Sequence, residues 1–298
     1  ALCGIVGLKT TVGRVSRAGV YPLSHSLDSV GPLARSVEDA ALVYQHLQGQ
    51  DAGDETTLGI APHDALRGLK SGVKDLRLAF AETVFFEGVE PALAQAVREA
   101  GRVLADLGAR VSSMDLPEAQ RALELNPRGL VVAAEAYAVN REYLEQHFAD
   151  LDPAVRERMA QGKLIPAPDY FASTRQWAAL RLQVLERLRD VDALLVPTTM
   201  IPALPVAEID ASPEVYARRN VQYLRNTSIG NILKLCGLSL PCGFNAQGLP
   251  MGLMIYGKPF QEDVVLRIGH AYEQATDWHR RAPDLSFAQG NALDQGRR

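Results

Sequence analysis

The sequence has few cysteines, no long apolar run and no excess of charge of one sign. Its three cysteines (Cys3, Cys236 and Cys242) are an odd number without the spacing of a metal-ligand pair, which is typical of a reduced, intracellular protein. The 31 basic residues are mixed along the chain with 35 acidic ones, so no basic region predicts binding of nucleic acid. Apolar runs are too short for a bilayer, and no signal peptide is recognisable. We therefore expect a cytoplasmic protein without nucleic-acid or membrane partners.

Several motifs of well-known catalytic sites are also missing. No G-x-S-x-G nucleophile elbow occurs, and the glycines of CGIVG fit no nucleotide-binding spacing. His270 and His279 are wrongly separated for a metal pair on one helix face, so we expect no metal and no other cofactor. Cys3 has no neighbour that would lower the pKa of its thiol, and its apolar surroundings predict a buried cysteine rather than a nucleophile.

The segment SHSLD contains His25, Ser26 and Asp28, which are the three residue types of a serine-hydrolase triad. Side chains so close in sequence rarely converge on one point, because a triad is recognised by geometry and not by adjacency. We interpret the segment as a turn.

The chain alternates between strand and helix patterns, which predicts an α/β fold with helices packed on a largely buried sheet. Apolar runs predict strands over residues 76–81, 109–114, 192–196 and 249–256. Helical spacing predicts helices over residues 36–48, 91–108, 130–145 and 171–189, and one that opens at Asp263 with a buried stripe of Val264, Ile268, Ala271 and Ala275. Residues 51–72 read as a surface loop, and a polar hinge containing Gly162, Pro166 and Pro168 separates two helices.

Three separated stretches together resemble the amidase signature family. The first is ALCGIVGLKTTVGRVSRAGVYPLSHSLDSVGPLARSVEDAALVYQ at residues 1–45, the second is LLVPTTMIPALP at 194–205, and the third covers 226–283. The resemblance implies one amidase domain over residues 1–285, incomplete at its N-terminus, with a mixed β-sheet core covered by helices on both faces. We expect a disordered tail at 286–298. It also implies that the family's catalytic lysine and two serines lie upstream of Ala1, so that this chain contains no catalytic residue.

The resemblance also implies where substrate is bound. Thr198 and Thr199 follow a strand at an edge that approaches the substrate cleft, although a capping role for these hydroxyls is an open alternative. Asn226, Thr227 and Asn231 open the third stretch and either line or brace the same cleft. Arg158 matches an arginine of the family that could meet a carbonyl or anionic end of the substrate, and a solvated helix charge is its alternative.

Two residues outside that set also receive an interpretation. Asp28 lies in a segment behind the nucleophile's loop in the family, and we expect it to accept hydrogen bonds from nearby backbone amides. Leu224 stands where the glutaminase subunit of the tRNA-dependent amidotransferase has an acidic residue for the α-amino group of glutamine. An apolar residue followed by Arg225 cannot receive an ammonium group.

The resulting prediction is an amidohydrolase that cleaves a carboxamide C–N bond through an acyl-serine intermediate. Its partner is a small-molecule amide, and a homodimer remains open. One alternative is the A subunit of a glutamyl-tRNA(Gln) or aspartyl-tRNA(Asn) amidotransferase. The other is a non-catalytic fragment or binding module.

Overall fold

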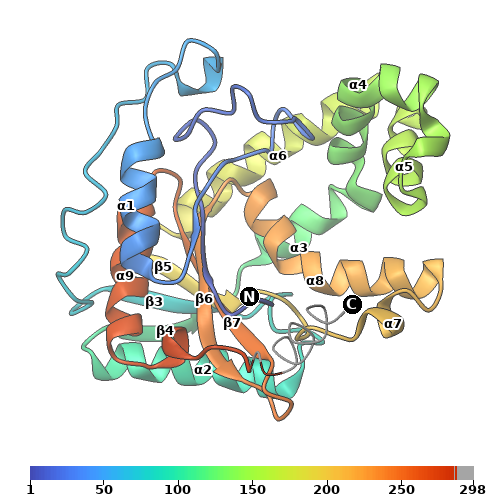
Figure 1. The fold of residues 1–298 in the computed structure, drawn as a ribbon. Coiled ribbons are helices and arrows are strands. Elements are labelled where there is room, and N and C mark those ends of the chain that lie inside the picture. The colour runs from blue at the N-terminus through green and yellow to red at the C-terminus, as the bar shows by residue number, and fades with distance from the viewer. Residues whose placement is uncertain (285, 287–298) are drawn as a thin grey trace, which may run out of the picture.

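The computed structural model describes residues 1–284 and 286, and Figure 1 shows a sheet with helices on both of its sides. Within these described residues the sheet has seven strands: β1 (Val6–Lys9), β2 (Leu33–Ala34), β3 (Arg77–Ala81), β4 (Arg110–Met114), β5 (Ala193–Pro197), β6 (Cys236–Phe244) and β7 (Pro250–Gly257). The α-helices are α1 (Val37–Leu47), α2 (Pro91–Asp106), α3 (Pro117–Glu124), α4 (Leu130–Gln146), α5 (Pro153–Ala160), α6 (Ala167–Arg187), α7 (Val206–Ile209), α8 (Pro213–Ile232) and α9 (Glu262–Gln274).

The strand order is β2-β1-β6-β7-β5-β3-β4. The pairs β3/β4 and β3/β5 are parallel, whereas the pairs along β2, β1, β6, β7 and β5 are antiparallel. The sheet is therefore mixed. The predicted α/β class with helices on both faces is confirmed.

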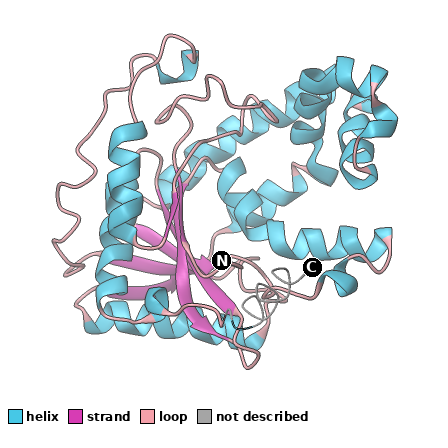
Figure 2. Cartoon of the chain, in the orientation of Figure 1, coloured by secondary structure: helices cyan, strands magenta, loops and turns pink. Residues whose placement is uncertain are grey.

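Two apolar clusters lie on opposite faces of the sheet. Helices α1, α2 and α9 pack on one face through residues such as Tyr44, Leu93 and Leu266. Helices α3, α6 and α8 pack on the other face through residues such as Ala119, Trp177 and Ile229. Helices α4 and α5 continue from this second layer and lie beyond the end of the sheet (Figure 2). Burial on both faces explains why β5 is apolar at every position.

The elements with strong local signals lie where the sequence predicts them. Ser36 caps α1 by accepting a hydrogen bond from the Asp39 amide at 3.1 Å, as the capping pattern indicates. Helix α2 begins at Pro91, which suits the first turn, and Gly108 follows it with a left-handed φ of 97°. Strands β3, β4, β5 and β7 match their predicted ranges within one or two residues.

Three local predictions need correction. In the predicted stripe of α9, Ile268 is buried and Val264 and Ala271 pack against the core, whereas Ala275 is exposed because it already forms the helix end. The predicted hinge is shorter than expected, because Pro168 already lies in the first turn of α6 and residues 161–164 form a 3-10 turn. Gly162 of that turn packs on α4, where a Cβ would lie 1.9 Å from the Ala133 carbonyl oxygen. Cys3 is exposed, because residues 2–4 form a turn and the strand begins only at Val6. Except for Ser286, the predicted tail at 286–298 lies outside the described residues.

Candidate functional site

Polar side chains meet where the carboxyl end of β5 lies against β6 and β7. The Thr198 hydroxyl is buried and lies 2.9 Å from the Ser239 hydroxyl, and the Thr198 amide donates to the Gly252 carbonyl at 3.0 Å. Ala1 lies at the same point, because a Cβ added to Gly252 would be 2.6 Å from the Ala1 Cβ and 2.9 Å from Thr198 Oγ1. Gly252 thus allows three chain segments to approach one another, and Figure 1 shows the N-terminus beside these strand ends.

Asn226 braces this strand end from α8. Its side-chain amide is buried and donates to the Pro197 carbonyl at 2.7 Å and to the Phe85 carbonyl at 3.0 Å. Its backbone carbonyl accepts from the Tyr256 hydroxyl at 2.9 Å. Pro197, the residue before Thr198, is therefore held against α8, and Asn226 stabilises the backbone around the site.

The other four predicted binding residues lie on different elements, and the hydroxyls of two of them already bind backbone carbonyls. Thr199 Oγ1 donates to the Ile201 carbonyl at 2.8 Å, and Thr227 Oγ1 donates to the Leu224 carbonyl at 2.9 Å, so both hydroxyls satisfy nearby backbone. Asn231 is half-buried near the end of α8. Arg158 is exposed on α5, in the helical layer beyond the sheet. Thr198, Asn226 and the strand end come together, whereas Arg158 lies on a separate element.

An open cavity of about 600 Å³ lies beside the loop that follows β1. Its walls come from the loops around residues 17–30 and 53–55 and from Val139 on α4. Among the described residues, none of the six predicted binding residues lines it. Its polar lining residues include Arg17, His25 and Asp28, of which sequence reasoning considered only the last two.

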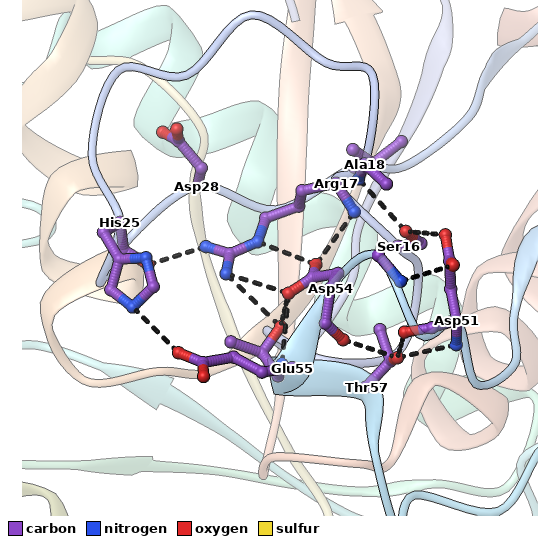
Figure 3. Close-up of polar contacts among 12 residues, drawn as sticks. Ser16, Arg17, Ala18, His25, Asp28, Asp51, Asp54, Glu55 and Thr57 are labelled. Carbon is purple, nitrogen blue, oxygen red and sulfur yellow. Dashed lines mark hydrogen bonds and ion pairs between the residues drawn. The ribbon is translucent and has the colours of Figure 1, made fainter. Parts of the chain in front are cut away.

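One wall of this cavity is held by the Arg17 side chain (Figure 3). Arg17 Nε donates to the Asp54 carboxylate at 3.1 Å, and Arg17 Nη1 donates to the His25 carbonyl at 2.6 Å. The Arg17 guanidinium holds the pKa of Asp54 far below its usual range. The ion pair therefore joins the two loops that form the cavity wall.

The opposite anchor of the same loop is Glu135 on α4. Its buried carboxylate accepts hydrogen bonds from Ser24 Oγ, from the Ser26 amide at 3.1 Å and from the Tyr170 hydroxyl at 2.6 Å. Burial alone would raise the pKa of Glu135, but the bonds from Ser24, Tyr170 and Ser26 outweigh it and lower that pKa. Sequence reasoning missed Glu135, because 111 residues separate it from Ser24.

The side chains of SHSLD diverge, which confirms that they form no triad. His25 Nε2 lies 3.9 Å from a Glu55 carboxylate oxygen, and Ser26 Oγ donates to Glu135. Asp28 accepts from the amides of Leu23 at 2.8 Å and Ser24 at 2.9 Å, as predicted.

Cys236 and Cys242 are buried as expected, and burial raises the pKa of Cys242 to about 12. Within residues 1–284 and 286, no three His, Cys, Asp or Glu side chains are arranged to hold a metal ion. None of the helices described there is both long and apolar enough to cross a membrane.

Comparison with known proteins identifies what this fold resembles. Residues 1–266 match the protein family described as Amidase. An amidase from Pseudomonas putida is 38% identical over 290 residues, which cover 96% of this chain and 61% of the relative. The A subunit of the glutamyl-tRNA(Gln) amidotransferase from Roseiflexus sp. (strain RS-1) is 35% identical over 308 residues, which cover 96% of this chain and 62% of the relative.

A solved structure agrees with the sequence comparison. It is described as a vestigial protein complex that reveals the evolutionary origins of an s-triazine catabolic enzyme, and it superposes with a TM-score of 0.81 at 28% identity. The superposition covers 92% of this chain and 59% of that chain. This chain thus spans about three-fifths of the length of the curated relatives it matches. With residues 1–266 matched and the sheet shared, the chain belongs to the amidase family.

Proposed function

We propose that this chain forms the scaffold and one wall of the substrate cleft of an amidohydrolase that cleaves a carboxamide C–N bond. The proposal rests on the family match over residues 1–266. The bond is broken through an acyl-serine intermediate, in which a serine attacks the carbonyl carbon, the amine or ammonia leaves, and water hydrolyses the ester. The reacting lysine and two serines belong to the part of the family that precedes the match to Ala1.

The strand end near Ala1 is the part of the proposed cleft that this chain supplies. Thr198 and Thr199 lie at that end, and Asn226 braces it from α8, the helix that also carries Thr227 and Asn231. Because the Thr198 and Ser239 hydroxyls already pair with one another, we assign them to the wall of the cleft and not to the chemistry. Arg158 lies on α5 and not at this strand end, so it would contact substrate from a different side.

A stand-alone amidase fits the surface of α8 better than an amidotransferase component does. Leu224 is 43% exposed and offers no carboxylate to an α-amino group. Beside it, Arg225 donates to the Glu87 carbonyl at 2.7 Å and to the Phe85 carbonyl at 3.2 Å, which holds a cation where an ammonium would approach. The identity to the Roseiflexus protein is the observation that keeps the glutaminase function as the second candidate.

The test compares the 298-residue chain with a parent polypeptide that includes the preceding family segment. We expect no amide hydrolysis by the 298 residues alone, and we expect a fluorophosphonate to label a serine of the longer protein. Hydrolysis by the 298 residues, lost when one of their own side chains is replaced, would refute the assignment. A strong glutaminase rate in the longer protein that rises with added B and C subunits would favour the second candidate.

A further inference from the structure

Three cationic side chains from distant parts of the sequence surround the loop between α8 and β6. Arg181 Nε on α6 donates to the Ile232 carbonyl at 2.7 Å, two residues before Lys234. Lys9 at the end of β1 pairs with Gly237, three residues after Lys234. The loop over residues 232–237 therefore carries Lys234 between the contact of Arg181 at one end and that of Lys9 at the other.

Lys9 points to the sheet face that α6 covers. Directly paired residues of antiparallel strands place their side chains on the same face. A Cβ added to Gly237 would lie 2.9 to 3.0 Å from side-chain atoms of Tyr256 and Met254, which belong to the apolar cluster under α6. The Lys9 ammonium and the Arg181 guanidinium thus lie on one side of the sheet.

Arg181 has an unused donor in this place. Its Nη2 atom is buried and has no hydrogen-bond partner within the described residues. Burial lowers the pKa of Arg181 to about 10. A buried guanidinium N–H without an acceptor is unfavourable, which indicates that an acceptor belongs there.

Lys234 is held in an unfavourable backbone conformation. Its φ is +56°, in the left-handed region that glycine adopts without strain, and its amide donates to the Asn231 carbonyl at 3.1 Å. Burial is the main cause that lowers the pKa of Lys234, and the like charges of Arg181 and Arg17 add to it. A glycine would suit this backbone better, although the conformation also ends α8, where the Leu235 amide donates to the Gly230 carbonyl at 3.0 Å.

Lys9 is the third cation and is also poorly compensated. Its only hydrogen bond among the described residues joins Nζ to the Thr10 carbonyl at 3.2 Å. Burial lowers the pKa of Lys9 to about 8, with further lowering from Lys234 and Arg181. Glu262 acts in the opposite direction, but its carboxylate already accepts from Arg14 Nε at 3.2 Å and from the Thr11 amide at 2.7 Å.

We propose that Lys9, Arg181 and Lys234 form a binding site for a small oxyanion, either a carboxylate or a phosphate. The unused Arg181 Nη2 donates to one oxygen, and the two ammonium groups neutralise the charge and donate to the others. Within the described residues, none of the three cations forms an ion pair. The site is independent of amide hydrolysis, because its assignment requires no acyl transfer.

The test titrates the 298-residue chain with sodium phosphate and, separately, with sodium acetate, each against sodium chloride of equal ionic strength. We expect a saturable rise in the thermal unfolding midpoint with at least one of the two oxyanions, and a matching calorimetric isotherm. Saturation by acetate alone identifies a carboxylate site, and saturation by phosphate alone identifies a phosphate site.

Variants locate the effect on these three residues. Lys234→Gly removes one cation and the backbone strain together, so its midpoint without oxyanion should not fall, while binding weakens about tenfold or more. Arg181→Lys should also weaken binding. Lys163→Ala, which removes an exposed lysine on a distant segment, should bind as the wild type does.

Two results would overturn the proposal. One is that neither oxyanion raises the unfolding midpoint more than sodium chloride does, and the other is that Lys234→Gly binds the oxyanion as tightly as the wild type. Labelling of amines followed by mass spectrometry gives a second measurement that needs no variant to fold. The bound oxyanion should slow modification of Lys9 and Lys234 relative to Lys163, and equal rates with and without it would refute the site.

Discussion

Glu135 is the residue on which the cavity loop depends most. Replacing it by alanine leaves the Ser24, Ser26 and Tyr170 donors without their acceptor in a buried place. We expect Glu135→Ala to lower the free energy of unfolding by about 3 kcal/mol, since each buried unsatisfied group costs about 1–3 kcal/mol. Urea denaturation measures the loss. Glu142→Ala, at an exposed position of the same helix, should change stability by less than about 0.5 kcal/mol.

The Glu135 contribution should also depend on pH. The folded-state pKa of Glu135 lies below its ordinary value of 4.5, so the carboxylate stabilises the fold fully above that value. The stabilisation is lost as pH falls through the folded-state pKa. The stability difference between the wild type and Glu135→Gln should therefore shrink as the pH is lowered from neutral through the acid range, and a constant difference would contradict this role.

Asn226 provides the second test at this scale. Asn226→Ala removes both donors to the Phe85 and Pro197 carbonyls, and we expect a loss of about 2–4 kcal/mol because two buried acceptors lose their partner. Asn220→Ala is the matched control, earlier on α8 and only half-buried. Chemical denaturation of the two variants should separate them clearly, and equal stabilities would mean that the brace is unimportant.

At the scale of elements, the contact between α8 and β7 depends on Gly230. A Cβ at this position would lie 2.4 to 2.5 Å from ring atoms of Tyr256. Gly230→Ala should destabilise the protein by about 1–3 kcal/mol, because the added methyl group forces the Tyr256 ring and α8 apart. This cost should exceed the gain from the higher helix propensity of alanine. Ser228→Ala on the same helix tests the helix preference without the clash. A Gly230→Ala variant as stable as Ser228→Ala would contradict the contact.

Elements differ in how far local sequence predicts them. Helix α1 and helix α2 carry their own start signals in Ser36 and Pro91, and both are predicted from them. Helix α8 and strand β6 are not predicted. Strand β6 is buried over almost its whole length and shows no alternation, and Gly, Ser and Pro residues interrupt the apolar run that made the equally buried β5 predictable. Its identity becomes clear only from its pairing with β1 and β7.

For the whole molecule, the two apolar faces should unfold together. The chain has two tryptophans: Trp177 is a buried residue of α6, and Trp278 packs against the cluster on the other face of the sheet. Because both clusters share one sheet, Trp278→Phe and Trp177→Phe variants should report coincident fluorescence transitions in urea, once each is corrected for its own stability by circular dichroism. Transitions in which fluorescence and circular dichroism separate would contradict the predicted single domain.

The sequence by itself determined the family, the α/β class, the capped helices and the rejection of a triad in SHSLD. These conclusions depend on signals that are local or are carried by motifs in a particular order. Only the tertiary structure decided which groups meet: Glu135 with the loop at Ser24, Arg17 with Asp54, and Arg181 with the Ile232 carbonyl. It also showed Cys3 to be exposed. The physical reason is that a contact across many residues depends on how strands pair and helices pack, and no local pattern records that choice.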